Sequence, residues 1–476
     1  MSKGKAYDAV VVGSGPNGLS AAITLARAGK KVLVREAAAT VGGASRSAEL
    51  TLPGFTHDVC SAVQALVPLS PFFQSLKLAD HGLSFVEPAA AFAHPLDDGT
   101  AAIAYRSFKQ TGATLGVDGA TWERKLGGFV THWEKLIPEL LAPMGLTAHP
   151  LLMANFGLGA MRSAQSLARK WFSDEPARAL FAGVAAHAIL PFDWTASAAA
   201  GLVLTVAAHV GGWPMVRGGA QELSNVLARY FTSLGGVIET NAPVGNIDEF
   251  SDGGAILCDV SPQQLIAMAG HKLPERYRRS LQRYRYGPGV WKVDWALDGP
   301  IPWNAEACAQ AGTVHLGGTF DEIAIAENAP WNGQHAEMPF VLLGQPSLFD
   351  SSRAPTGKHT AWAYCLVPNG SNVDMTDRIE SQVERFAKGF RQRILAKHVM
   401  SPADFQAYNA NLIGGDITGG ANMLRQVFAR PALRRDPYAT PVKGLYLCSA
   451  STPPGGGVHG MCGYWAARSA LRRDFV

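Results

Sequence analysis

The stretch 10–22, VVVGSGPNGLSAA, constrains the fold of this chain more than any other, because its three glycines have the spacing G-x-G-x-x-G. The residues before the glycines, YDAVVV, predict a short buried strand, since they are rich in valine and almost continuously hydrophobic. The residues after them, LSAAITLARAGK, predict a helix that stops at Gly29. KKVLVRE then predicts a second strand that ends at Glu36. This order of elements is the βαβ unit in which such a motif binds a dinucleotide.

The motif residues have separate physical roles. The first glycine permits a tight turn, the second lets the backbone approach a pyrophosphate, and the third lets the helix pack close to the strand. The helix N-terminus faces the phosphate charge, and Glu36 can accept both hydrogens of a ribose diol. A carboxylate here also repels a 2′-phosphate, which argues against NADP. The residues predicted to bind the dinucleotide are therefore Gly13, Gly15, Pro16, Asn17, Gly18 and Glu36.

A second glycine segment, TVGGASRS, follows Glu36 and contains Gly42, Gly43 and Arg46. Backbone N–H groups and a guanidinium bind phosphate strongly, so this segment suits a second contact with the same pyrophosphate. The alternative is an ordinary glycine turn beside a surface arginine. Its place next to the ribose acid favours the phosphate contact.

The far end of the chain carries a third glycine-rich segment. Residues 444–471, GLYLCSASTPPGGGVHGMCGYWAARSAL, predict a buried strand over 445–448, a Pro/Gly loop and a helix that begins near Val458. Consecutive glycines before a helix suggest backbone donors aimed at an electron-rich group, which in a flavin is the pyrimidine end of the isoalloxazine. In mid-chain, residues 216–247 predict a helix that ends at Gly235 and Gly236 and is followed by paired strands.

Together with PGFTHDVCSAV at 53–63, these segments resemble the phytoene desaturase-like flavoproteins. The likeness is greatest to the branch called pyridine nucleotide-disulfide oxidoreductase domain-containing protein 2, and it runs nearly end to end. The resemblance implies that FAD is held non-covalently by the residues of the two N-terminal glycine segments. It also implies that the backbone at Val244 reaches the adenine, and that Gly457 and Val458 reach the flavin ring.

The three cofactor segments lie at the start, middle and end of the chain, so the cofactor domain must be discontinuous. We predict an α/β fold with a Rossmann-type FAD-binding domain, of the glutathione reductase-like kind, over 1–88, 214–287 and 408–476. A mixed α+β substrate domain is expected over 89–213 and 288–407, because the first piece has a helical pattern and the second contains alternating runs such as VWKVDWALDG. An apolar cavity is expected where the domains meet.

Few residues stand out as candidates for catalysis. His459 lies where the resemblance places the flavin, and it could stabilise reduced flavin or shuttle a proton; the alternative is a histidine that caps its helix. His57 and Asp58 offer an acid/base pair, but neighbours on an extended segment point to opposite sides. Tyr464 and Trp465 are expected to pack rather than to face the flavin.

Several classes of site are not expected. The six cysteines are scattered without a C-x-x-C pair, so we expect free thiols and neither a zinc knuckle nor a redox dithiol. The histidines lack ligand spacing, so no metal is expected. The nearest approach to a second dinucleotide motif, FGLGAM at 156–161, lacks the third glycine. A bound nicotinamide is therefore not the expected electron source, despite the name of the branch.

Charge and hydropathy limit the partners. A net charge of +4 over 476 residues gives no support for nucleic acid. The basic and aromatic stretch 275–289 predicts a solvated helix face, with contact to anionic lipid headgroups as the alternative. The apolar run 195–210 is shorter than the roughly 20 residues needed to span a bilayer, so it predicts a buried helix, or else a membrane-surface or lipid-tunnel element. No signal peptide is recognised, and we expect a cytoplasmic protein with peripheral contact at the inner membrane face.

The sequence thus predicts an FAD-dependent oxidoreductase whose substrate is a hydrophobic small molecule such as an isoprenoid, carotenoid or other lipid. Desaturation and redox-neutral isomerisation remain equally open, because both need a C–H or C=C group held over the flavin in a dry pocket. The alternatives are an amine oxidase-like flavoenzyme and a flavin-binding lipid chaperone without turnover. Substrate, electron acceptor and oligomeric state stay undetermined at this point.

Overall fold

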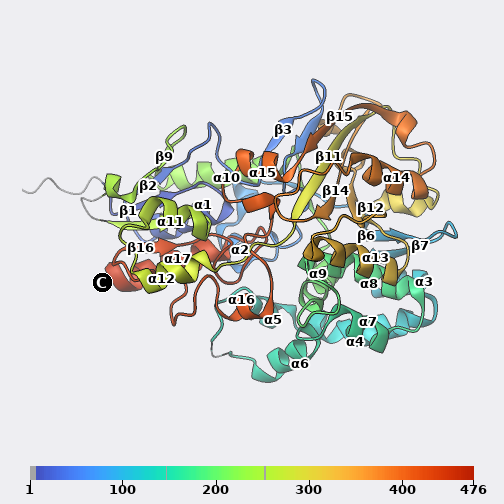
Figure 1. Ribbon diagram of the computed structural model, residues 1–476, viewed down its shortest axis with the longest axis horizontal. Helices are drawn as coiled ribbons and strands as arrows, with labels where there is room; N and C mark the ends of the chain where they lie inside the picture. The colour runs from blue at the N-terminus through green and yellow to red at the C-terminus, as the bar shows by residue number, and fades with distance from the viewer. Residues whose placement is uncertain (1–6, 146, 251–253, 476) are drawn as a thin grey trace, which may run out of the picture.

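The computed structural model of the protein describes residues 7–145, 147–250 and 254–475. Within them the strands form a five-stranded sheet, a seven-stranded sheet and two small two-stranded sheets. Figure 1 shows the five-stranded sheet and its helices at one end of the molecule and the seven-stranded sheet at the other. The first six residues, where no targeting signal was expected, lie outside the described part.

The five-stranded sheet has the order β16-β10-β1-β2-β9, and every pairing in it is parallel. Its strands are β1 (Ala9–Val12), β2 (Val32–Arg35), β9 (Val237–Glu239), β10 (Ala255–Cys258) and β16 (Leu445–Leu447). Helices α1 (Pro16–Arg27), α10 (Ala220–Ser233) and α17 (Met461–Asp474) cover one face, and α11 (Pro262–Ala269) and α12 (Glu275–Gln282) cover the other. Residues Val10 and Val11 belong to different cores, which is why this strand is hydrophobic at every position.

Local details of the nucleotide-binding unit agree with the glycine argument. The helix after the first loop ends at Arg27, and Gly29 follows with φ +76°. A Cβ on Gly18 would lie 2.1 Å from the carbonyl oxygen of Gly13, so only glycine allows this approach of helix and strand.

Two expectations of detail were wrong. The last helix begins at Met461 rather than near Val458, because the glycine-rich loop continues through Gly460, which has φ +69°. The two strands that follow Gly236 do not pair with each other: β9 pairs with β2, and β10 pairs with β1 and β16. Each of them completes the parallel sheet instead of forming a hairpin.

The seven-stranded sheet has the order β15-β11-β14-β13-β12-β6-β7. Its strands are β6 (Ala90–Pro95), β7 (Ala101–Tyr105), β11 (Gly289–Leu297), β12 (Ala311–Leu316), β13 (Val341–Gly344), β14 (His359–Val367) and β15 (Ile394–Met400). Its outer face packs under α14 (Thr376–Phe386), while the inner face contributes Phe92, Leu342 and Trp362 to the main core. The strands of the two large sheets fall within the two sets of segments assigned from the sequence to the two domains, although the boundaries themselves stay a prediction.

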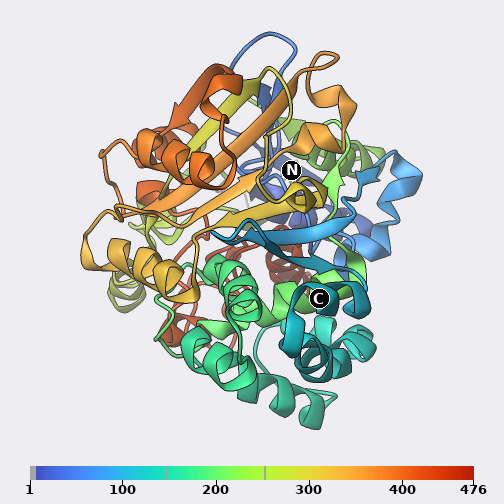
Figure 2. The same ribbon diagram turned by 90° about the vertical axis from the view of Figure 1, so that its right-hand side faces the viewer.

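A layer of helices lies beside the inner face of this sheet, as Figure 2 shows. It consists of α3 (Phe108–Thr114), α4 (Gly119–Thr131), α5 (Trp133–Leu140), α6 (Pro150–Ala160), α7 (Ala164–Trp171), α8 (Glu175–Ala185) and α9 (Ala198–Gly211). The apolar run 195–210 forms most of α9, whose residues Leu202 and Val206 are fully buried. Among the described residues, no helix has the length and apolar character needed to cross a membrane.

The remaining elements connect these layers. They include the small sheets β3–β4 (Ser47–Glu49, Thr56–Asp58) and β5–β8 (Phe85–Val86, Met215–Val216), and the short helices α2 (Pro71–Leu76), α13 (Phe320–Asn328), α15 (Pro402–Tyr408) and α16 (Leu424–Phe428). One 3₁₀ turn, η3 (Ala186–Ala188), matters for the site because it directly follows α8.

Candidate functional site

One cavity of about 1690 Å³ extends from the first glycine loop to the inner face of the seven-stranded sheet. Most residues predicted to bind the cofactor line it. These are Gly13, Gly15, Pro16, Asn17, Glu36, Gly43, Arg46, Val244, Gly457 and Val458, and the candidate catalytic residue His459 lines it too. Segments from the start, the middle and the end of the chain therefore meet around one space.

Gly18 and Gly42 do not line the cavity, and both have a supporting position instead. The amide of Gly18 donates to Asp259 Oδ2 at 2.8 Å. The amide of Gly42 donates to the carbonyl oxygen of Ser14 at 3.0 Å, which ties the second glycine segment to the first.

The two N-terminal glycine segments form a cradle that contains almost no side chains. A Cβ on Gly43 would lie 3.0 Å from the Cα of Gly15, so the two backbones touch. Ser45 Oγ and Asn17 Oδ1 face this region, are buried and have no hydrogen-bond partner among the described residues. Buried polar atoms of this kind need a partner, so the cradle fits a polar ligand of phosphate size.

Glu36 is the centre of a buried hydrogen-bond network at the end of β2. Its Oε2 accepts from the amide of Ser14 at 2.9 Å and from Ser14 Oγ at 2.5 Å. Its Oε1 accepts from the amide of Ala38 at 2.8 Å and from the guanidinium of Arg46 at 3.3 Å. The hydroxyl and the guanidinium are the kind of donors that a ribose diol would replace, whereas the two amides are fixed by the backbone.

Asp259, which the sequence analysis missed, lies between these segments directly after β10. A Cβ on Gly15 would lie 2.8 Å from its Oδ2, so the carboxyl group sits against the phosphate cradle. Burial and the nearby Glu36 raise the pKa of Asp259 to about 7, although the amide of Gly18 opposes the shift. A signal was available, because the carboxyl end of a strand beside β1 is where such sheets bind ligands.

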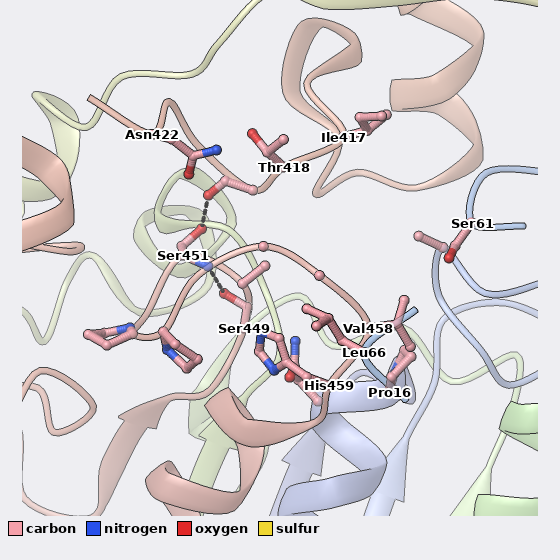
Figure 3. A pocket seen from close by; sticks show the side chains of 18 of the residues that line it. Pro16, Ser61, Leu66, Ile417, Thr418, Asn422, Ser449, Ser451, Val458 and His459 are labelled. Atoms are coloured by element: carbon pink, nitrogen blue, oxygen red, sulfur yellow. Dashed lines mark hydrogen bonds between the residues drawn. The ribbon is translucent and has the colours of Figure 1, made fainter. Parts of the chain in front are cut away.

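The opposite part of the cavity is formed by the loop 449–459. Gly455 and Gly457 have φ +113° and +123°, so residues with side chains would be strained there. The loop is held by Ser449, whose hydroxyl donates to the carbonyl oxygen of Val260 at 2.7 Å, and by Ser451, which donates to that of Gly419 at 2.8 Å. Figure 3 shows Val458 and His459 on this loop, close to Pro16 and Leu66.

His459 directly precedes Gly460, the N-cap residue of α17, and its ring binds the first amide of that helix. Its Nδ1 accepts from the amide of Met461 at 3.1 Å, at the start of α17, and its carbonyl oxygen accepts from Ser70 Oγ at 2.6 Å. Burial lowers the pKa of His459 to about 4, so the ring is neutral at physiological pH. A proton shuttle near neutrality does not match this ring, and a catalytic role for His459 stays a prediction.

His57 and Asp58 both lie in β4 and neither lines the cavity. Asp58 pairs with Arg353 at 2.6 Å, and His57 Nδ1 lies 3.6 Å from Asp294. Burial, together with Lys292 and Arg353, lowers the pKa of His57 to about 3. The two residues therefore belong to a buried network that joins β4 to the seven-stranded sheet.

Other sequence expectations have clear outcomes. Trp465 Nε1 donates to the carbonyl oxygen of Leu141 at 3.0 Å, and Tyr464 packs on Phe72, so both aromatic residues pack outside the cavity lining. The string at 156–161 lies mostly within α6 and forms no nucleotide-binding loop. All six cysteines lie in the described part of the chain, and each is a free thiol. No cluster of potential metal ligands occurs among the described residues, and the expectation that no metal is bound stays a prediction.

Beyond the loop 449–459, the cavity is largely apolar. Helix α9 contributes Val203 and Leu204, and the sheet contributes Leu342. The lining of this part also includes Met153, Phe156, Ala160, Ala199, Ala200, Trp213, Trp362 and Tyr364. The run 195–210 thus forms a largely buried helix, one side of which lines the cavity, and its alternative role as a lipid-tunnel or membrane-surface element stays a prediction.

Comparisons with known proteins agree with this geometry. The sequence profile of a family described as "Flavin containing amine oxidoreductase" matches residues 17–462. The chain is 27% identical over 555 residues to pyridine nucleotide-disulfide oxidoreductase domain-containing protein 2 of Rattus norvegicus, with 98% of this chain and 93% of the relative covered. It is 25% identical to a lycopene-forming phytoene desaturase of Pseudescherichia vulneris, over 97% of this chain and 98% of the relative. An oxidoreductase structure from Methanosarcina mazei has a TM-score of 0.67 at 16% identity, and the match covers 98% of this chain and 99% of that one.

Proposed function

We propose that this chain, which belongs to the family of flavin containing amine oxidoreductases, acts on a largely hydrophobic molecule by desaturation or isomerisation, because much of its cavity is lined by apolar side chains. The family resemblance and the fold class expected from the sequence are confirmed. The protein is an FAD-dependent oxidoreductase, and the identity of its substrate is the part that we propose.

The residues that would hold FAD are those of the cradle described above. The backbone of Gly15 and Gly43 and the guanidinium of Arg46 are suited to the pyrophosphate, Glu36 to the ribose, and Val244 to the adenine. Gly457 and Val458 are suited to the flavin ring. When bound, FAD supplies the acceptor for a hydride from a substrate C–H bond.

The apolar lining of the cavity beyond the loop 449–459 is the observation that carries the proposal. From Val458 to Leu204 it offers aliphatic and aromatic surface, which excludes water and orients a greasy chain. The neutral, capped ring of His459 provides no acid or base near neutral pH in this region. We infer that the chain's own contribution to the reaction is mainly positioning and exclusion of water.

The rim of the cavity supports entry from a lipid surface. Met144, Met161 and Phe428 both line the cavity and are exposed, with exposed fractions of 60%, 40% and 54%. Leu151 and Leu158 on α6 extend the patch and are 87% and 75% exposed. In Figure 1 helices α5, α6 and α16 lie at the same edge of the molecule.

This rim replaces the segment 275–289 as the proposed lipid contact. On α12 the guanidinium groups of Arg278 and Arg279 pair with Glu275, which is what a solvated helix face looks like. Peripheral contact with a membrane through the rim is therefore part of the proposed function. The cytoplasmic location expected from the sequence is a separate proposal, on which the rim has no bearing.

The test begins with the purified protein and its flavin content. Anaerobic mixing with isoprenoid, fatty-acyl and amine panels should bleach the visible flavin absorbance with an isoprenoid or fatty-acyl compound. Bleaching by amines alone would support amine oxidation instead. Isomerisation is redox-neutral and causes no bleaching, so it is tested by adding the same lipids to chemically reduced protein and analysing them for isomerised product. Tight lipid binding with neither bleaching nor isomerised product would support a lipid chaperone and contradict the proposed reaction.

Membrane contact needs a separate measurement. Flotation with vesicles of phosphatidylcholine and phosphatidylglycerol should carry the wild-type protein, and Leu158→Asp should reduce the bound fraction severalfold. Val117→Asp is the matched control, because Val117 is 71% exposed and lies in the turn Gly116–Asp118, outside α5, α6 and α16. Equal flotation of the two variants would contradict a role of the rim.

A further inference from the structure

Two histidines stand out in the apolar part of the cavity. His187, in η3, lines the cavity, and its Nε2 lies 3.3 Å from Nε2 of His315. His315 is fully buried on β12 behind it, and its Nδ1 has no partner among the described residues. Neither residue has a place in the flavin site or in the positioning role proposed above.

The register of the sheet brings other polar groups to the same place. Thr313 and His315 are two residues apart on β12, so their side chains share the inner face of the sheet. Thr313 also lines the cavity, and its hydroxyl accepts from Trp213 Nε1 at 2.9 Å. The rings of His187 and Trp213 are in edge contact, with centroids 6.2 Å apart. The cavity-lining residues His187, Trp213 and Thr313 therefore lie next to one another in a wall that is otherwise apolar.

The surrounding helix leaves room for this arrangement. A Cβ on Gly183 of α8 would lie 2.5 Å from Nδ1 of His315. Only glycine at this position allows the His315 ring to lie under the helix and reach His187. The pair is thus held in place by the packing of α8 against β12 and is not a chance contact of two surface side chains.

Chemistry decides which hydrogens the pair presents. Burial lowers the pKa of His187 to about 4, and burial together with His187 and His94 lowers that of His315, so both rings are neutral. A neutral imidazole has one donor and one acceptor nitrogen, so one hydrogen lies between the two Nε2 atoms. Because a buried N–H without a partner is rarer than a buried acceptor without one, we assign the hydrogen to Nε2 of His315, which leaves its unpartnered Nδ1 as the bare nitrogen. His315 then donates to His187, and His187 carries its own hydrogen on Nδ1.

Two free donors follow from this assignment. His187 is partly exposed and lines the cavity, and only its Nε2 has a hydrogen-bond partner among the described residues. The Thr313 hydroxyl accepts from Trp213 and retains its own hydrogen. Two donors on the wall of an apolar cavity match the two lone pairs of a carbonyl oxygen, whereas they offer nothing to a pure hydrocarbon.

We propose that His187, supported by His315, and Thr313 form a binding site for an uncharged carbonyl oxygen on an otherwise apolar substrate. This inference rests on the proposed function and narrows its substrate class from hydrocarbons to oxygenated hydrophobic molecules. His315 is a positioning residue, because it acts through His187. An anion is not the expected ligand, since neither histidine is charged.

The test compares three ligands with the same sixteen-carbon chain that differ only in the group at carbon 2. Binding of 2-hexadecanone, 2-hexadecanol and hexadecane to the flavin-loaded protein is measured by displacement of Nile red. The wild-type protein should bind the ketone about tenfold more tightly than the alkane, the usual effect of a buried hydrogen bond. His187→Phe should remove this preference while leaving the affinity for hexadecane within about twofold.

Two further variants make the outcome specific. Thr313→Val keeps the size of the side chain and should reduce the preference for the ketone about threefold. His149→Phe changes another cavity-lining histidine, whose Nδ1 is paired with Glu139 at 2.9 Å, and should leave the preference intact. Retained flavin content and an unchanged thermal midpoint identify the variants that fold normally.

Equal binding of ketone and alkane by the wild-type protein would overturn the proposal, and so would a preference that survives in both His187→Phe and Thr313→Val. A preference for the alcohol over the ketone would also overturn it, because the site would then offer an acceptor to a hydroxyl group and not two donors to a carbonyl oxygen. Because binding is measured without turnover, a ketone preference in a protein that no substrate bleaches would separate this inference from the proposed reaction.

Discussion

The carboxyl group of Asp259 accepts a hydrogen bond from the amide of Gly18 at 2.8 Å, at the N-terminus of α1. The donor belongs to the first glycine loop and the acceptor follows a strand from the middle of the chain, 241 residues away. An acidic group therefore lies against the cradle that is suited to a pyrophosphate. Its protonation state links pH to stability and to cofactor binding.

The first prediction concerns the flavin-free protein. The pKa of Asp259 is raised to about 7 from 3.8, so the folded state holds this proton more tightly than the unfolded state. Its contribution to stability is present at low pH and is lost as pH rises from about 4 to about 7. Asp259→Asn keeps an acceptor for Gly18 and should be more stable than wild type at pH 8, by up to about 4 kcal/mol, but not at pH 4. Urea unfolding at both pH values measures this, and an equal difference at the two would contradict it.

The second prediction concerns the affinity for FAD. Because a pyrophosphate brings negative charge to the cradle, binding should be tighter at pH 6 than at pH 8, by about tenfold. Asp259→Asn should remove most of this dependence. Titration of flavin-free protein with FAD, followed by flavin fluorescence, gives the dissociation constants. A wild-type affinity that does not change with pH would show that Asp259 is already ionised or moves away.

The third prediction concerns Glu36. Glu36→Gln replaces an oxygen that accepts from amides by an NH₂ group, so FAD affinity should fall by about tenfold to a hundredfold. Glu123→Gln is the matched control, because Glu123 is exposed on α4. Both variants are titrated with FAD as above. An unchanged affinity in Glu36→Gln would remove the ribose role assigned to this residue.

The fourth prediction separates a cradle glycine from a turn glycine. Gly15 has φ −63°, so Gly15→Ala should fold, but its new Cβ would lie 2.8 Å from Asp259 and cover the cradle. The variant should be purified without flavin colour. Gly29 has φ +76° and open space around it, so Gly29→Ala should lose about 1 kcal/mol of stability and remain yellow. A yellow Gly15→Ala protein would contradict the assignment of the cradle.

The fifth prediction concerns His459. Asparagine can still accept from the amide of Met461, so His459→Asn should preserve the fold and change the rate at which the bleaching substrate reduces the flavin by less than about fivefold. The pKa of about 4 predicts no inflection between pH 6 and 9 that depends on this residue. A titration near pH 7 that is present in wild type and absent in the variant would establish the proton shuttle instead.

The sequence alone predicted the nucleotide-binding unit because its causes are local. Gly13 and Gly18 are in contact within one loop and one helix turn, and Glu36 directly follows the next strand. A run of hydrophobic residues and glycines at a fixed spacing can both be recognised in the sequence itself. The cofactor followed from these local signals together with the resemblance.

Residues that depend on long-range packing were not predictable in the same way. The place of Asp259 at the end of a buried strand was a signal for a ligand site, but its contact with Gly15 depends on β10 lying beside β1. Nothing near His57 in the chain reveals its contact with Asp294. The pair His187 and His315 is separated by 128 residues and depends on the missing side chain of Gly183.

What the sequence determined by itself is therefore the class of fold and a dinucleotide-binding loop, since both follow from backbone geometry within short segments, and the choice of FAD also needed the resemblance. Only the tertiary structure decided which polar side chains face the cavity and which are buried in ion pairs. The physical reason is that strand register and helix packing set the surroundings of each side chain. Those surroundings determine its protonation, its free hydrogens and the chemistry that it can offer to a ligand.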